Sequence, residues 1–187
     1  MQVSYKGLME KVQNCDKCKL SQTRTNTVFG EGDLHASVML VGEGPGLNED
    51  KTGRPFVGQA GMLLDKMLAA INISREDVYI CNVVKCRPPG NRVPTDEEAS
   101  ACLPYLRGQY AIIKPKIIVC LGATAAKYLL EPTIKVTRDR GQFFYKKGVW
   151  LIATYHPAAL LRDASKKHEA WADLQAIRDK MQELNII

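Results

Sequence analysis

Four short runs of apolar and β-branched residues recur along the chain, and more polar segments separate them. Runs of this length and composition predict buried β-strands, and helical patterns separate at least the first three. Alternating strands and helices predict an α/β fold with a largely parallel sheet. The four expected strands are residues 37–41, 78–84, 116–122 and 149–155.

Sequence signals also place the helices. Thr95 and Glu98 have the spacing of a capping box, which opens a helix running past Cys102. The other expected helices are residues 62–71, residues 123–130 with Thr124 as the cap, and an amphipathic closing helix over residues 168–184.

Polar residues stand at the ends of all four expected strands. In parallel sheets, ligands bind beyond the carboxyl ends of the strands. We therefore expect one crevice to be formed by Gly42 with Glu43, by Asn82, by residues 122–124 and by His156.

Charge and length set broad limits on function. The 187 residues include 26 Lys and Arg against 20 Asp and Glu, a net charge of +6. This balance fits a nucleic-acid partner, although a solvated basic surface explains it equally well. No apolar run approaches the roughly 20 residues that span a bilayer, and the first residues lack the apolar core of a signal peptide. We expect a single-domain, soluble, cytoplasmic protein with no membrane contact.

The six cysteines divide into two groups. Cys81 and Cys120 lie in apolar strand-like runs, where a thiol packs as a small hydrophobic group. The other four lie among polar or turn-forming residues and suit a zinc ion or an iron–sulfur cluster, with four unrelated thiols as the alternative. Only one pair has the tight C-x2-C spacing, which favours a 4Fe-4S cluster over a zinc ribbon. These four are Cys15, Cys18, Cys86 and Cys102.

A glycine-rich stretch, GEGPGLNEDKTGRPFVGQAG, follows the first strand at residues 42–61. It contains neither a P-loop pattern nor G-x-G-x-x-G, because Leu47 stands where the last glycine belongs, so nucleotide binding by those routes is disfavoured. The stretch predicts a tight loop carrying Glu43, Glu49 and Phe56, and an ordinary surface loop with one anchoring Phe is the alternative.

The segment HPAALLR follows the fourth strand at residues 156–162. A histidine at the carboxyl edge of a sheet suggests catalysis, although a lone histidine is more often structural. The adjacent leucines, followed by basic residues, fit a wedge that enters a DNA groove and unstacks bases; a helix start with inward leucines is the alternative.

Together these blocks resemble the family 4 uracil-DNA glycosylases, the iron–sulfur branch of the uracil-DNA glycosylase superfamily. CDKC, the glycine-rich stretch, YICNVVKCRPPGNRVPTDEEASAC, LGATAAK and HPAALLR occur in the family's order over nearly the whole chain. The resemblance implies a three-layer α/β/α sandwich around a central four-stranded parallel sheet. It also implies one domain over residues 1–187, whose N-terminal segment is held by a 4Fe-4S cluster on the four cysteines. The activity that it implies is removal of uracil from DNA.

The resemblance assigns roles around a flipped-out base. Phe56 would stack on uracil, while the Asn82 amide would accept from its N3–H and donate to O4, which rejects cytosine. Glu49 would lie near the C5 edge, and His156 would donate to O2 as negative charge builds. The remaining expected site residues are Glu43 for the attacking water, Gly42 and Gly44 around the base, and Leu160, Arg162 and Thr124 on DNA.

The chain departs from its relatives in two places. Better-studied branches have an Asp where Gly44 stands, which leaves Glu43 as the candidate to orient the water. In addition, Ala158 stands after His156 and Pro157, where relatives often have serine. The implied partner is uracil-containing DNA, single- or double-stranded, bound by a monomer. The alternatives are a non-catalytic iron–sulfur DNA-binding or replication-accessory protein and a zinc-stabilised nucleotide hydrolase.

Overall fold

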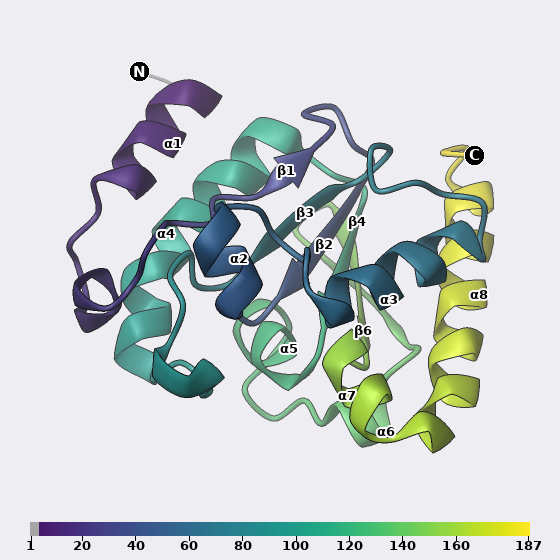
Figure 1. The fold of residues 1–187 in the computed structure, drawn as a ribbon. Helices are drawn as coiled ribbons and strands as arrows, with labels where there is room; N and C mark the ends of the chain where they lie inside the picture. Colours follow the sequence, from purple (N-terminus) through teal and green to yellow (C-terminus); the bar gives the residue numbers. More distant parts are fainter. Residues whose placement is uncertain (1–3) are drawn as a thin grey trace.

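A computed structural model describes residues 4–187, which form a six-stranded sheet with helices on both faces (Figure 1). The strands are β1 (Glu31–Gly32), β2 (Val38–Gly42), β3 (Tyr79–Asn82), β4 (Ile117–Leu121), β5 (Phe143–Lys146) and β6 (Val149–Thr154). The α-helices are α1 (Tyr5–Gln13), α2 (Leu47–Thr52), α3 (Gln59–Ala69), α4 (Asp96–Ile113), α5 (Ala123–Leu129), α6 (Val136–Asp139), α7 (Pro157–Arg162) and α8 (Lys167–Glu183). The short 3-10 helices are η1 (Lys19–Gln22), η2 (Pro89–Asn91) and η3 (Ala164–Lys166).

The four strands expected from the sequence are confirmed as the centre of the sheet. The strand order is β1-β3-β2-β4-β6-β5, and β3, β2, β4 and β6 pair in parallel. The chain crosses from β2 to β3 in one direction and from β3 to β4 in the other, so the order reverses between β2 and β4. Such a reversal opens a crevice at the carboxyl ends of the two strands.

Two antiparallel edge strands were not expected from the sequence. β1 pairs with β3, and β5 pairs with β6 through a two-residue turn at Lys147 and Gly148. Both turn residues have positive φ, which matches the twist of a tight hairpin. The sequence pattern did not reveal β5 because its residues are mostly half-exposed and do not form a buried apolar run.

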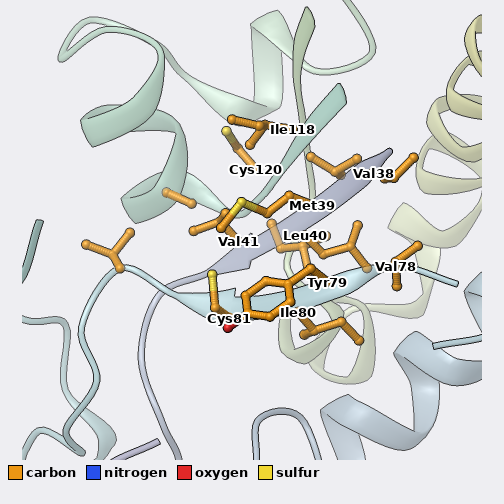
Figure 2. Packing of buried hydrophobic residues seen from close by; sticks show 14 of the residues in the cluster. Val38, Met39, Leu40, Val41, Val78, Tyr79, Ile80, Cys81, Ile118 and Cys120 are labelled. Atoms are coloured by element: carbon orange, nitrogen blue, oxygen red, sulfur yellow. The ribbon is translucent and has the colours of Figure 1, made fainter. Parts of the chain in front are cut away.

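The core is centred on the parallel strands, whose side chains are buried on both faces (Figure 2). Burial on both faces explains why these strands read as continuous apolar runs and do not alternate with polar residues. Cys81 and Cys120 are fully buried among the strand side chains, as the sequence predicts.

Helix ends determine which side chains reach the carboxyl edge. The capping box at Thr95 is confirmed, since its hydroxyl accepts from the Glu98 amide and Glu98 accepts from the Thr95 amide. The expected cap at Thr124 is wrong, because α5 begins after Gly122, whose φ of 94° suits glycine. A Cβ on Gly122 would lie 3.0 Å from the His156 Cβ, so this glycine lets β4 end close to the β6 end.

Candidate functional site

A wide cleft opens at the carboxyl ends of the parallel strands, with about 1740 Å³ of open space including its mouth. This is more room than one small planar ligand needs. The cleft is lined by most of the residues expected from the sequence, namely Glu43, Gly44, Glu49, Phe56, Asn82, Thr124, His156 and Arg162.

Gly42, the last residue of β2, does not itself line the cleft but lies against two side chains that do, those of Asn82 and Phe56. A Cβ there would lie 2.5 Å from Asn82 Oδ1 and 2.6 Å from Phe56 Cζ, so only glycine lets both side chains approach. Asn82 is 2% exposed, and its Oδ1 has no hydrogen-bond partner among the described residues. A buried unpaired oxygen costs about 1–3 kcal/mol, so a ligand that donates to it recovers this energy.

Phe56 is held rigidly at the wall. Its φ is +50°, and Arg75 donates to its carbonyl at 2.8 Å and to the Pro55 carbonyl at 2.6 Å. Gly61 is required beneath it, because a Cβ there would lie 1.7 Å from the Phe56 oxygen. This fixed aromatic ring is a suitable face for stacking a planar base.

Glu49 supports the same loop. Its Oε1 accepts from the amides of Val57 and Gly58 at 3.0 and 2.9 Å, where α3 begins. A carboxylate is favoured at a helix N-terminus, because the free amides and the helix dipole both attract negative charge. The geometry therefore gives Glu49 a role in holding the Phe56 loop, in addition to lining the cleft as the sequence analysis expected.

The His156 side chain is a neutral hydrogen-bond donor. Its Nδ1 accepts from the Ala158 amide at 3.1 Å, which puts the proton of the neutral ring on Nε2. The pKa of His156 is lowered to about 4, mainly by burial and also by the nearby Arg162, while Glu49 opposes the shift. The imidazole stacks on the Phe56 ring with centroids 5.5 Å apart. His156, Phe56 and Asn82 therefore meet in one place, as the sequence analysis requires.

Glu43 is positioned by Thr124, whose hydroxyl donates to Glu43 Oε2. This contact joins the β2 end to the first turn of α5. The expectation that Thr124 contacts DNA does not fit this arrangement, because Thr124 is buried and its hydroxyl is already paired with Glu43. Thr124 instead orients the Glu43 carboxylate.

The expected DNA wedge also needs a correction. Leu160 is 2% exposed and packs in the core, whereas Leu161 is 48% exposed on α7. A buried side chain cannot enter a groove, so the exposed leucine of the pair is Leu161. The sequence could not separate the two leucines, because the choice depends on how α7 rotates against α3. Arg162 is exposed at the cleft, as expected for a phosphate contact.

The cleft also contains residues that the sequence analysis did not single out. Asn91 and Arg92 line it from the turn after Pro88, and Tyr155 and Lys166 line it near His156. The sequence signal for Asn91 was its position after Gly90 in the PPGN turn, where Asn tolerates positive φ.

A second, smaller hollow, with about 340 Å³ of open space including its mouth, lies between the N-terminal segment and α4. Cys15, Cys18, Cys86 and Cys102 all line it, together with apolar and charged neighbours. Within residues 4–187 no three His, Cys, Asp or Glu side chains have the spacing needed to hold a single metal ion.

Burial and hydrogen bonding both act on the thiols of this cavity. Burial raises the pKa of Cys102 to about 11 and also raises that of Cys86, which Arg24 opposes. Arg24 donates to Cys86 Sγ at 3.3 Å and to the Cys15 carbonyl at 2.7 Å. The Lys85 amide donates to Cys102 Sγ at 3.3 Å. Hydrogen bonds to the sulfurs are a usual part of iron–sulfur sites.

Among the described residues, no helix is both long enough and apolar enough to cross a membrane. All six cysteines are free of disulfides.

Comparisons with known proteins show which proteins this chain is similar to. Residues 29–175 match the family model described as the uracil DNA glycosylase superfamily. A type-4 uracil-DNA glycosylase of Thermotoga maritima is 52% identical, covering 84% of this chain and 83% of the relative. A type-4 uracil-DNA glycosylase of Pyrobaculum aerophilum is 47% identical, covering 89% of this chain and 89% of the relative. One of Archaeoglobus fulgidus is 45% identical, covering 93% of this chain and 92% of the relative.

Proposed function

The chain belongs to the uracil DNA glycosylase superfamily and removes uracil from DNA as a glycosylase, and on this premise we propose how its cleft performs the reaction. The reaction is a hydrolysis. The water oxygen bonds to C1′ of the deoxyribose, the C1′–N1 bond breaks, and its electron pair leaves with uracil. The hydroxyl of water ends on the sugar and one proton on the base, which leaves an abasic site.

The observation that carries the proposal is the buried, unpaired Oδ1 of Asn82 beside the Phe56 ring. A base that swings out of the stack loses its stacking partners, and the Phe56 ring replaces one of them. The N3–H of uracil donates to Asn82 Oδ1, whereas cytosine presents a bare N3 there. Cytosine therefore leaves the buried oxygen unpaired, at a cost that lowers its binding.

Two further side chains act on the reacting groups. We assign His156 Nε2–H to the uracil O2, where a neutral imidazole stabilises the negative charge by a hydrogen bond and keeps its proton. We assign Glu43, held by Thr124, to orient the attacking water. Gly44 lets the chain after Glu43 pack closely against Val84, because a Cβ there would lie 2.8 Å from the Val84 side chain.

We propose that the exposed Leu161 enters the gap left by the base, and that Arg162 contacts a neighbouring phosphate. Because Ala158 lines the cleft without a hydroxyl, phosphate binding relies on the basic side chains there. Binding to single- or double-stranded uracil DNA, the monomeric state, the single-domain organisation and the cytoplasmic location stay predictions.

We also propose that Cys15, Cys18, Cys86 and Cys102 hold a 4Fe-4S cluster. When bound, it supplies a structural link between the N-terminal segment and the start of α4, and the hydrolysis needs no electron from it. Cys86 lies in the segment that directly follows β3, whose last residue is Asn82. A cluster bound to Cys86 therefore also supports the end of β3.

The test uses 5′-labelled oligonucleotides with one uracil, single- and double-stranded, followed by alkali to cleave abasic sites. We expect cleavage at the uracil and none at a matched cytosine. Asn82→Ala and His156→Ala should each lower the single-turnover rate by roughly 100- to 1000-fold. The control His35→Ala, in an exposed turn before β2 and outside the lining of the cleft, should not. If the wild-type protein leaves both uracil substrates intact, the proposed function is wrong.

A non-catalytic DNA-binding protein is the alternative, and binding measurements separate it from the enzyme. Fluorescence anisotropy on the same oligonucleotides should show that Asn82→Ala keeps affinity within a few-fold while its cleavage rate falls, because the amide acts on one base and not on the phosphates. A protein that binds uracil DNA tightly but never releases the base would favour the alternative.

A further inference from the structure

A lysine is buried in the wall between the cleft and the thiol cavity. Lys85 is 1% exposed, and its Nζ donates to the Asn82 carbonyl at 2.7 Å and to Gln109 Oε1 at 2.6 Å. Asn82 lines the cleft, while Lys85 itself lines the cavity of the four thiols. The ammonium group therefore lies directly behind the residue that reads the base.

The Lys85 ammonium group has no carboxylate partner among the described residues. Its hydrogen-bond acceptors are two neutral oxygens, and the sulfurs of Cys81 and Cys102 also interact with its charge. The short distances are typical of bonds from a charged donor. Burying a cation costs several kcal/mol unless acceptors surround it, and an apolar side chain of similar size would avoid that cost. The cavity thiols favour a basic residue in this wall, and the 2.7 Å bond to the Asn82 carbonyl directs its ammonium group toward the base pocket.

A chain of buried groups holds the lysine in place. Gln109 is fully buried, and its Nε2 donates to the Phe29 carbonyl at 2.7 Å and to the Tyr79 hydroxyl at 2.9 Å. These two bonds direct Gln109 Oε1 toward Lys85. The Tyr79 hydroxyl in turn pairs with that of Tyr5 at 3.2 Å. These contacts hold the Lys85 ammonium group against the Asn82 carbonyl at the end of β3.

The reaction needs positive potential at this place. Uracil leaves with negative charge, and His156 is neutral at ordinary pH, so it offers a hydrogen bond without a full charge. A fixed cation in a dry wall acts more strongly than one in water, because little solvent screens it.

Resting on the function proposed above, we propose that Lys85 is a positioning residue of the base pocket. Its ammonium holds the Asn82 peptide group and places a fixed positive charge behind the edge that receives the departing base. Lys85 does not touch the base and acts through Asn82, so it forms no covalent intermediate.

The test compares two leaving groups. 5-Fluorouracil is a better leaving group than uracil, because fluorine stabilises its anion, so its departure depends less on charge in the pocket. We compare single-turnover rates on uracil and 5-fluorouracil oligonucleotides for wild type, Lys85→Met and Lys85→Gln. Both variants remove the charge, and Lys85→Gln keeps a hydrogen-bond donor. For each variant, we expect the rate on uracil to fall at least about ten times more than the rate on 5-fluorouracil.

The ratio of the two rates does not depend on the fraction of folded enzyme, so partial unfolding does not obscure it. Visible absorption of the same preparations shows whether the thiol site has changed. Tyr5→Phe, which alters only the far end of the chain of buried groups, is the matched control and should leave the ratio unchanged. Equal losses on both substrates, or no loss, would overturn the role of Lys85 while leaving the glycosylase function intact. A wild-type protein that cleaves neither substrate would instead refute the function itself.

Discussion

Adding a single methyl group at Gly42 tests whether Asn82 and Phe56 form one base pocket. Gly42 ends β2, and an alanine Cβ there would lie 2.5 Å from Asn82 Oδ1 and 2.6 Å from Phe56 Cζ. Both distances are well below van der Waals contact, so the amide or the ring must move. Phe56 has little freedom, because Arg75 holds its carbonyl and Gly61 packs beneath it. The methyl group therefore displaces a group that reads the base.

The expected loss follows from the cost of overpacking. Inserting one methyl group into a well-packed site costs about 1–3 kcal/mol. If that cost falls on the bound transition state, the rate falls by about 5- to 150-fold, because each 1.36 kcal/mol is a factor of ten. The backbone of Gly42 lies in a strand with no positive φ, so alanine itself fits the local conformation. We expect lost activity with a small loss of stability.

The assay is single-turnover cleavage of a uracil oligonucleotide, with thermal unfolding measured in parallel. Gly148→Ala is the matched control: its Cβ meets nothing within 4 Å, but its φ of 86° strains alanine by roughly 1–2 kcal/mol. Gly148→Ala should therefore lose stability and keep its rate, the reverse of Gly42→Ala. A Gly42→Ala enzyme with the wild-type rate would refute the close packing of Asn82 and Phe56 as the basis of the pocket.

Three other predictions follow from the site. The pKa of His156 is about 4 in the folded protein and 6.5 in the unfolded chain, so the unfolded chain binds the proton more readily. The contribution of the neutral His156 to stability is therefore complete above pH 6.5 and is lost as pH falls toward 4, by up to ~3 kcal/mol. The pH dependence of urea unfolding, compared with that of His156→Gln, measures this loss. Cys102→Ser should lose iron and visible absorption after anaerobic purification, whereas Cys120→Ser, buried elsewhere in the core, should keep both; equal iron in the two variants would contradict the proposed cluster site. Leu161→Ala should lower the rate on double-stranded more than on single-stranded DNA without loss of stability, whereas Leu160→Ala should cost about 2–5 kcal/mol in unfolding; the opposite pattern would restore Leu160 as the wedge.

The sequence by itself determined the elements whose signals are local. Continuous apolar runs marked the four parallel strands, and the spacing of Thr95 and Glu98 marked a helix start, because neighbours a few residues apart make these interactions. It also separated the core cysteines from those that line the thiol cavity, since the flanking residues differ in polarity. The carboxyl-edge rule then placed Asn82 and His156 in one cleft.

Only the tertiary structure decided what each side chain does there. It placed Leu161 and not Leu160 at the surface, paired Thr124 with Glu43, and buried Lys85 behind Asn82. These outcomes depend on contacts between segments tens of residues apart, which no local pattern encodes. Exposure, hydrogen-bond pairing and protonation are set by everything that surrounds a group, so they become definite only when the distant parts of the chain have packed together.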